Sequence, residues 1–243
     1  MTRASDDLLL AHSSDLHIDE DFTARVHGGD GTAGLRLVLA AARRVSADVL
    51  LLVGDVFDNH RVGPETLARV NAMLAEAAAA MPIVVLPGNH DPAIAGGVYQ
   101  RGGLTEIPNV HVFGLTHEEH LPLPEFSLEI LGRPHRDYED MVPLRPGRLR
   151  AARWHVVLAH GHFEWRRDRA NPLRPSWLIS EDEIEATGAD YLALGHWDRP
   201  VAVGDGAVPA YYSGSPELAK TINVIRLSPA TGVSVHREPL EPG

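Results

Sequence analysis

Three apolar segments of the chain share one design, in which a strand-like run ends abruptly in polar residues. They read LLLAHSSDLH (8–17), DVLLLVGD (48–55) and PIVVLPGNHD (82–91). Between them lie two segments with helical patterns, one over 34–47 with apolar side chains on one face and one at about 64–80. An alternation of strands and helices favours right-handed crossovers that pair the strands in parallel. The pattern predicts an α/β fold built on a mainly parallel sheet with helices outside it.

The second half of the chain contains further strand patterns. We expect strands at about 110–114, 126–131, 155–159 and 190–194, followed by a β-rich tail that includes AYYSG, INVIRL and VSVHRE. With 243 residues, of which 44% are hydrophobic, the chain can bury a substantial core, and no long linker divides it. We therefore expect one domain over residues 1–243.

Composition excludes several classes of site and location. The chain has no cysteine, which rules out disulfides and thiolate metal sites. No apolar segment approaches the roughly 20 residues of a membrane span, and the first residues do not form a secretory apolar region. We expect a cytoplasmic protein with no membrane association. The formal net charge of −11 argues against wholesale binding to nucleic acid or anionic lipid.

Aspartate, asparagine and histidine side chains follow five of the predicted strands at the point where each strand ends. Because the carboxyl ends of strands in an open α/β sheet meet at one edge, we expect these side chains to converge. Glycine directly precedes three of the groups, and we expect it to permit tight turns or close backbone approach there. The five groups are Asp15 with His17; Asp55 with Asp58; Asn89, His90 and Asp91; His160 with His162; and His196 with Asp198.

Each group alone is typical of turn or capping chemistry, and the repetition is what indicates a metal site. The set offers carboxylate, imidazole and amide groups, and histidine is frequent, with 14 residues in the chain. Such ligands suit divalent ions such as Mn²⁺, Fe²⁺, Zn²⁺ or Co²⁺. There are enough of them for two ions.

The chain resembles the calcineurin-like metallophosphoesterases. The resemblance rests on DLH (15–17), GDVFD (54–58), GNHD (88–91), AHGH (159–162) and GHWD (195–198), which follow the order of that family's motifs. Within the family, the stretches LLAHSSDLHI and DYLALGHWDRP are most similar to the SbcD-type DNA repair exonucleases. The resemblance implies a four-layer α-β-β-α sandwich with its metal site at the carboxyl edge of the strands.

The resemblance also implies roles for individual residues. Asp55 would bridge two divalent ions, for which we favour Mn²⁺, with Fe²⁺ or Zn²⁺ as alternatives. Asp15 and His17 would complete one site, and Asn89, His160 and His196 the other. A water or hydroxide shared by the ions would attack phosphorus. His90 would face the leaving group as an acid, oriented by either Asp58 or Asp91; the sequence leaves that choice open.

Position 198 departs from the family pattern, which has histidine there. Asp198 either binds the ion of the Asp15 site through oxygen or is too short to reach it, and we favour binding because carboxylate is a competent ligand. His162 is an alternative ligand or a polar pocket wall. His12, in the first motif, is expected to lie behind the ligands.

The implied reaction is hydrolysis of a phosphodiester, with DNA or a nucleotide as the candidate substrate. Eight arginines over 145–174 would supply a basic border to the site or else form a solvated face. The alternatives are a phosphomonoesterase acting on a nucleotide or phosphoprotein, and a non-catalytic binding module on the same fold. The sequence indicates no partner protein or oligomeric state. The arginines are Arg145, Arg148, Arg150, Arg153, Arg166, Arg167, Arg169 and Arg174.

Overall fold

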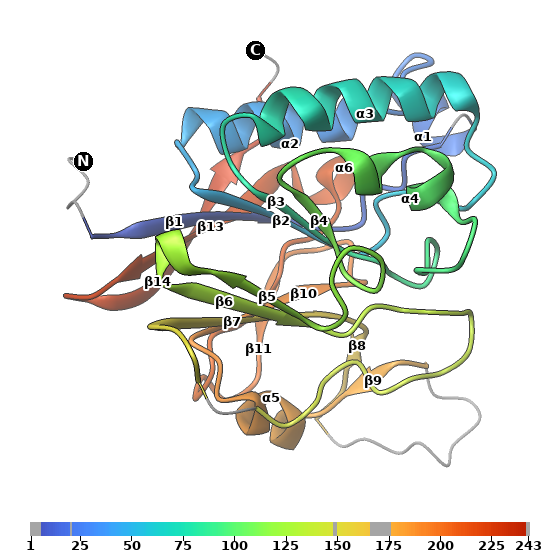
Figure 1. Cartoon of the computed structure of the whole chain (residues 1–243). Coiled ribbons are helices and arrows are strands. Elements are labelled where there is room, and N and C mark those ends of the chain that lie inside the picture. The colour runs from blue at the N-terminus through green and yellow to red at the C-terminus, as the bar shows by residue number, and fades with distance from the viewer. Residues whose placement is uncertain (1–5, 20, 148–149, 166–175, 242–243) are drawn as a thin grey trace.

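Two six-stranded sheets lie face to face with helices on their outer sides (Figure 1). The computed structural model describes residues 6–19, 21–147, 150–165 and 176–241. The order of layers is helix, sheet, sheet, helix, which confirms the four-layer α-β-β-α sandwich. None of the described helices is long and apolar enough to cross a membrane.

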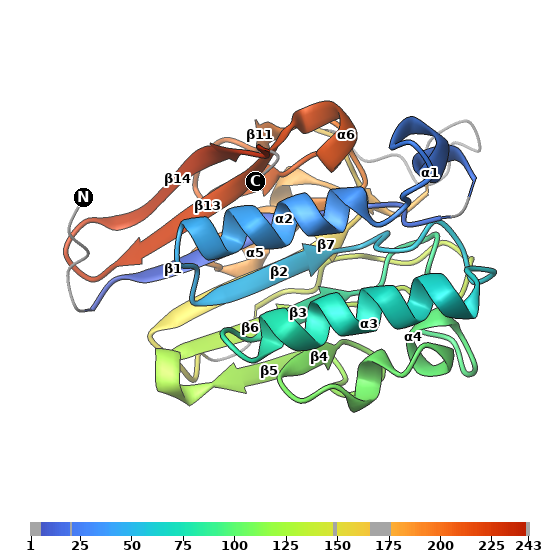
Figure 2. The same cartoon turned by 90° about the horizontal axis from the view of Figure 1, so that it is seen from above.

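The first sheet contains the three strands that open the chain. Its order is β14-β13-β1-β2-β3-β4, with β1 to β4 parallel to one another and β13 antiparallel to β1. Two long helices, α2 (Ala33–Arg44) and α3 (Pro64–Ala78), lie side by side over its outer face (Figure 2). The strands are β1 (Leu8–Ser13), β2 (Val49–Val53), β3 (Ile83–Leu86), β4 (Val110–Val112), β13 (Thr221–Ser228) and β14 (Gly232–Pro239).

Asp30 holds the start of α2. Its carboxylate accepts hydrogen bonds from the backbone N–H of Thr32 at 3.0 Å and from its hydroxyl at 2.6 Å, and it pairs with Arg36 at 2.7 Å. Burial raises the pKa of Asp30, but the hydrogen bonds from Thr32 and Arg36 outweigh this effect and lower it to about 2. The ionised form of Asp30 therefore stabilises this corner of the fold.

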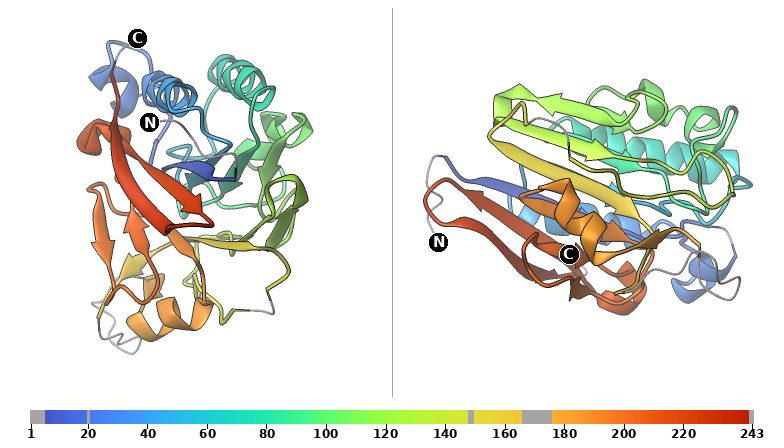
Figure 3. Two further views of the ribbon diagram at one scale, coloured as in Figure 1. Left: turned by 90° about the vertical axis from the view of Figure 1, so that its left-hand side faces the viewer. Right: turned by 90° about the horizontal axis from the view of Figure 1, so that it is seen from below.

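The second sheet has a thinner outer layer. Its order is β11-β12-β10-β7-β6-β5, and the seven-residue helix α5 (Glu181–Thr187) packs on its outer face. Seen from below, α5 covers one part of the sheet, and the green strands β5 and β6 lie outside it (Figure 3). The strands are β5 (His120–Leu123), β6 (Leu128–Gly132), β7 (Trp154–His160), β10 (Tyr191–Gly195), β11 (Val201–Val203) and β12 (Ala210–Tyr212).

Short elements connect these layers. They are the helices α1 (Phe22–Val26), α4 (Val98–Arg101) and α6 (Pro216–Ala219), the 3₁₀ turns Leu104–Glu106 and Pro124–Phe126, and a two-stranded ribbon of β8 (His162–Phe163) and β9 (Leu178–Ile179). Its first strand, β8, follows directly after β7, so the ribbon lies next to the end of the strand that carries His160.

Both faces of the central strands are buried, which explains their continuous apolar runs. Alternate residues of β2 serve different layers: Leu51 and Val53 belong to the core between the sheets, and Leu50 and Leu52 to the core beneath the helices. His12 is fully buried between the sheets, where its Nδ1 is hydrogen-bonded to the hydroxyl of Tyr191 at 2.9 Å. Burial lowers the pKa of His12 to about 3, so its imidazole is neutral at pH 7.

The strand and helix patterns account for most elements but not for their pairing. Residue patterning alone predicts one mainly parallel sheet, whereas β5, β6, β7, β10, β11 and β12 form a second sheet, as the family resemblance implied. The strand β5 is absent from the prediction because its sequence, HLPL, is short and contains Pro122, which is tolerated in an edge strand. The helix expected at about 64–80 ends at Ala78. A single domain over 1–243 stays a prediction.

Candidate metal centre

The carboxyl ends of strands from both sheets meet at one edge of the molecule. β1, β2 and β3 contribute from the first sheet, and β7 and β10 from the second. Asp15, Asp55 and His160 are all buried there, with one ligand atom of each lying within 4.8 Å of the others. The sequence analysis predicted that side chains after five strands converge, and these three residues follow three of those strands.

His160 is held in one orientation by the backbone of the other sheet. Its Nδ1 lies 3.1 Å from the carbonyl oxygen of Val53 and donates to it, which directs Nε2 towards the Asp55 carboxylate, 3.2 Å away. A fixed imidazole whose far nitrogen bonds a carbonyl is the arrangement that metal-binding histidines use.

The electrostatics of this group favour a bound cation. Burial raises the pKa of Asp15, an effect that the charge of His160 opposes and that of Asp55 increases. Burial also works against ionised Asp55, yet His160 holds the pKa of Asp55 well below its ordinary range. His160 in turn has its pKa raised to about 9, because the Asp55 and Asp15 carboxylates outweigh the effect of burial. Two buried carboxylates thus depend on positive charge between them.

Asn89 and His196 extend the group. Asn89 Oδ1 lies 3.0 Å from His160 Nε2 and 3.2 Å from His196 Nδ1. Ligand atoms around one ion with bonds of about 2.1 Å are separated by about 3.0–3.5 Å, so this spacing fits a common ion. Burial and the neighbouring His160 lower the pKa of His196 to about 3, which leaves its imidazole neutral, as a ligand must be.

A second group lies at the more exposed side of the site and contains His17, Asp58 and His90. The Asp58 carboxylate is 3.5 Å from Nδ1 of His17 and 3.5 Å from Nδ1 of His90. His90 Nδ1 is also hydrogen-bonded to the backbone oxygen of Asp58 at 2.9 Å, and the backbone N–H of His90 donates to Asp55 at 2.9 Å. Asp55 and Asp58 therefore fix the position of His90, while 43% of its side chain stays exposed.

The two carboxylates considered for orienting His90 have different surroundings. Asp91 is fully buried and accepts hydrogen bonds from the backbone N–H of Phe57 at 3.0 Å and of Gly88 at 2.8 Å, and from the Tyr99 hydroxyl at 2.6 Å. Burial and the charge of Asp55 raise the pKa of Asp91 to about 6. Asp91 therefore connects the loop after β2 with the loop after β3. Of the two carboxylates, only that of Asp58 contacts the imidazole of His90 within the described structure.

Backbone strain is concentrated at the predicted ligands. Asp15, His17, Asp55 and His196 all have positive φ, at 55°, 44°, 51° and 107°. Non-glycine residues rarely adopt this region, and where they do the strain often marks a functional site. The surrounding structure holds these four side chains in directions that ordinary strand geometry does not provide.

The preceding glycines make the close packing possible. Gly54 has a φ of 82°, and a Cβ there would overlap the imidazole of His160. A Cβ on Gly88 would overlap the Asp55 carboxylate, and one on Gly195 would overlap the carbonyl of Val53. Close backbone approach is thus the role of all three glycines, as expected from their positions.

Two predicted residues lie apart from the ligand groups. The side chain of Asp198 is exposed and belongs to neither group, although its backbone oxygen accepts a hydrogen bond from Ser215 at 3.0 Å. His162 is half-buried in β8, and its Nδ1 accepts a hydrogen bond from the indole of Trp197 at 3.1 Å. His162 forms a wall of the site beside His196, at 6.1 Å between ring centres.

The described arginines of the basic segment are engaged away from the ligand groups. Arg145 pairs with Glu119 at 3.3 Å, Arg150 pairs with Asp190 at 3.0 Å, and Arg153 lies over the ring of Trp154. The other five, Arg148, Arg166, Arg167, Arg169 and Arg174, lie outside the described residues.

Sequence reasoning missed three supporting residues. The Ser14 hydroxyl donates to Asp15 and is hydrogen-bonded to the hydroxyl of Ser213 at 2.8 Å. His135 is fully buried and its Nε2 lies 3.0 Å from the backbone oxygen of His160. Burial and the charge of His160 lower the pKa of His135 to about 4, so neutral His135 donates to that oxygen. Ser14 and Ser213 lie in stretches that the sequence analysis singled out, LLAHSSDLHI and AYYSG, whereas His135 lies outside every motif and the sequence offered no signal for it.

Comparisons with known proteins give a consistent family assignment. A model described as calcineurin-like phosphoesterase matches residues 8–213. The SbcD subunit of the nuclease SbcCD from Bacillus subtilis (strain 168) is 23% identical over 270 residues, covering 90% of this chain and 66% of the relative. The uncharacterized metallophosphoesterase YhaO of the same organism is 27% identical over 207 residues, covering 78% of this chain and 48% of the relative.

A solved structure shares the fold. It is the 2.05 Å crystal structure of a putative 5'-nucleotidase from Staphylococcus aureus in complex with alpha-ketoglutarate, with a TM-score of 0.59 and 15% sequence identity. The match covers 98% of this chain and 55% of that one. The chain thus spans 48–66% of the lengths of these three proteins.

Proposed function

Because the chain belongs to the calcineurin-like phosphoesterases, a family of metal-dependent hydrolases, we propose that it is a phosphodiesterase that uses two divalent ions. The observation that carries this proposal is the position of Asp55. One carboxylate oxygen lies 3.2 Å from His160 Nε2, and the other accepts the backbone N–H of His90. Asp55 is therefore shared between the buried group and the exposed group of the site.

Two ions would divide the ligands, with Asp55 able to contribute to both sites. Asn89, His160 and His196 would hold one ion with Asp55, because their atoms have the spacing of a single coordination sphere. Asp15 and His17 would hold the other. We favour Mn²⁺, with Fe²⁺ or Zn²⁺ as alternatives, since oxygen and imidazole ligands suit all three. When bound, the ions act as Lewis acids on the phosphoryl group and lower the pKa of water for attack on phosphorus.

The protein's own groups would handle the leaving oxygen. His90 is exposed and fixed from behind at Nδ1, so its Nε2 is free to meet a substrate oxygen and give it a proton or a hydrogen bond. The Asp58 carboxylate, 3.5 Å from His90 Nδ1, would offset positive charge that forms on the ring during the reaction. Asp91 holds the loops that carry these groups, through its three hydrogen bonds.

A phosphodiester, either DNA or a nucleotide, is the substrate class that we propose. The support is the likeness to a nuclease subunit over 90% of this chain. The net charge of −11 favours a small diester or a short strand end over long duplex. The complete set of six ligands argues against a module that only binds, and a cytoplasmic location stays part of the proposal.

The test measures bound metal and hydrolysis together. Protein loaded with Mn²⁺ is assayed on bis(p-nitrophenyl) phosphate, p-nitrophenyl phosphate and a DNA oligonucleotide. We expect two ions per chain and preference for diesters. Asp55→Asn should lose metal and activity, and His90→Asn should keep the metal and lose about 100-fold in turnover. Asp21→Asn, which alters a 90% exposed carboxylate, is the charge-matched control.

Two results would contradict the proposal. Full metal content and activity in Asp55→Asn would exclude a shared carboxylate. A preference for p-nitrophenyl phosphate would instead favour a phosphomonoesterase, and the DNA oligonucleotide separates a nuclease from an enzyme of small diesters.

A further inference from the structure

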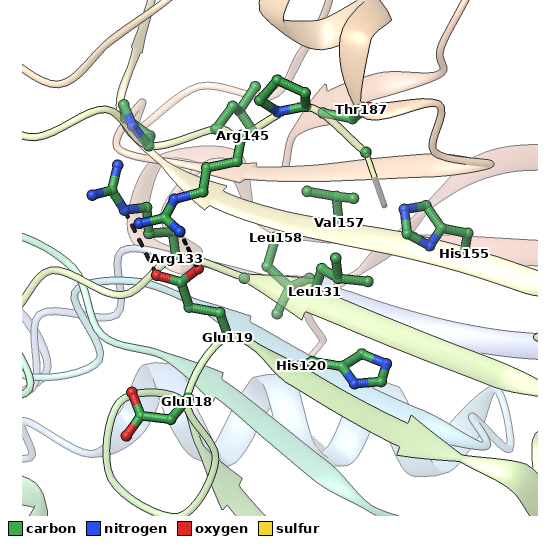
Figure 4. A pocket seen from close by; sticks show the side chains of 15 residues that line it. Glu118, Glu119, His120, Leu131, Arg133, Arg145, His155, Val157, Leu158 and Thr187 are labelled. Atoms are coloured by element: carbon green, nitrogen blue, oxygen red, sulfur yellow. Dashed lines mark ion pairs between the residues drawn. The ribbon is translucent and has the colours of Figure 1, made fainter. Parts of the chain in front are cut away.

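A cavity of about 500 Å³ lies on the outer face of the second sheet, over β6 and β7 (Figure 4). It occurs where the outer layer is thin: α5 reaches it only with Thr187, and the segment 143–147 forms the rest of the roof. Among the described residues, no proposed metal ligand lines it. The cavity is thus separate from the metal centre.

The floor and one wall of this cavity are apolar. Leu131 and Val157 extend outwards from β6 and β7, and Leu144 covers them from the roof. Leu131 and Val157 lie between two polar ends (Figure 4). A volume of this size, with an apolar middle between polar ends, falls in the range of sites for small organic molecules, which occupy about 300–1,000 Å³.

One end of the cavity is cationic. Arg133 Nε lies 3.8 Å from one oxygen of Glu119, and Arg145 Nη1 lies 3.3 Å from the other, so two guanidinium groups share one carboxylate (Figure 4). The adjacent Glu118 does not offset them, because it pairs with Arg136 at 2.6 Å. Burial and the charge of Arg145 lower the pKa of Arg133, against the effect of Glu119. Positive charge therefore remains in excess at this end.

The opposite end carries the imidazole of His155. Its Nδ1 is held at 3.0 Å by Glu129, which is itself 1% exposed and also contacts His120 at 3.2 Å. The other ring nitrogen, Nε2, is buried and has no hydrogen-bond partner among the described residues. An unpaired buried nitrogen beside a cavity is a place where a polar group of a ligand can bind.

We propose that this cavity binds a small organic carboxylate with an apolar body. The carboxylate would lie between Arg133 and Arg145, where planar guanidinium groups match it in shape and charge. The body would lie on Leu131 and Val157. The proposal is independent of the reaction at the metal centre, since the two sites share no residue.

The test uses 2-naphthoate as the probe and neutral 2-naphthamide as its matched control. Binding to the full chain loaded with Mn²⁺ is measured by calorimetry, and Arg145→Gln distinguishes binding in the cavity from coordination of the carboxylate to metal. We expect 2-naphthoate to bind at least tenfold more tightly than 2-naphthamide. Arg145→Gln alters a side chain that is 59% exposed and should weaken 2-naphthoate about tenfold, with 2-naphthamide unchanged.

Two further variants locate the probe. Val157→Phe should weaken both compounds by filling the cavity, and its thermal unfolding temperature shows whether the fold is retained. Arg43→Gln, whose guanidinium pairs with Glu76 at 2.8 Å on the helical face, should have no effect. Equal affinity for both compounds, no binding of 2-naphthoate at 5 mM, or unchanged affinity in Arg145→Gln would overturn the proposal. A loss in Arg43→Gln alone would do the same, because the probe would then lie on the helices.

Discussion

The substitution Asp58→Asn tests how His90 is activated. The Asp58 carboxylate lies 3.5 Å from His90 Nδ1, whereas the backbone oxygen of residue 58, at 2.9 Å, is unaffected by the change. The variant therefore removes a charge and leaves the hydrogen bond that positions the ring. Any loss of turnover reports the electrostatic contribution rather than a displaced imidazole.

The expected loss of activity can be calculated from the 3.5 Å between the Asp58 carboxylate and His90 Nδ1. Two unit charges 3.5 Å apart attract by about 1 kcal/mol in water and by about 5 kcal/mol at an effective dielectric constant of 20. Because the two side chains are 38% and 43% exposed, screening favours the low end of this range. We expect a loss of about 1–2 kcal/mol in transition-state stabilisation, which is about a tenfold fall in kcat. The KM should change little.

The assay is a double-mutant cycle on diester hydrolysis. The kcat values of Asp58→Asn, His90→Asn and the double variant are compared. In the variant that lacks His90, adding Asp58→Asn should lower kcat by less than about twofold. Bound metal is measured in each, because Asp58 also lies 3.5 Å from His17, a proposed ligand. An unchanged kcat in Asp58→Asn, or a tenfold loss that persists without His90, would refute this reasoning.

Three further substitutions test other parts of the structure. Gly88→Ala should lose bound metal and at least tenfold in activity, measured by metal analysis and hydrolysis, since its methyl group would displace the Asp55 carboxylate. Asp198→Ala should keep its metal content and activity within about twofold because the side chain is exposed and lies outside both ligand groups; loss of one ion would instead make Asp198 a ligand. Asp30→Asn should destabilise the fold by about 1–2 kcal/mol at pH 7. The folded pKa of Asp30, about 2, is below its unfolded value, so this difference should be present above about pH 4 and vanish as the pH falls towards 2, as followed by urea unfolding.

The local patterns of the sequence predict strands well but leave their pairing open. β6 and β7 are recognisable as apolar runs, yet nothing in their residues says that they pair with each other rather than with β3. Pairing depends on contacts between distant segments, which a pattern with a period of two residues does not encode. The family resemblance supplied the second sheet.

The sequence predicted some of the site residues and not others for a similar reason. Strand ends place Asp15, Asp55 and His160 together because the topology of the sheets brings them there. The choice between Asp58 and Asp91 depends instead on the direction of each side chain after a strained turn, which spacing alone does not determine. The same holds for Asp198, which follows a residue with a φ of 107° by two positions.

The candidate metal centre lies where the two sheets meet. The backbone N–H of His196 bonds the carboxylate of Asp15 across a separation of 181 residues, and His160 reaches Val53 across a separation of 107. In a chain without cysteine, ions bound here would act as a non-covalent crosslink that closes both of these loops. Metal loading should therefore slow amide hydrogen exchange along β2 and β10 together, and chelation should let the two sheets open as separate cooperative units.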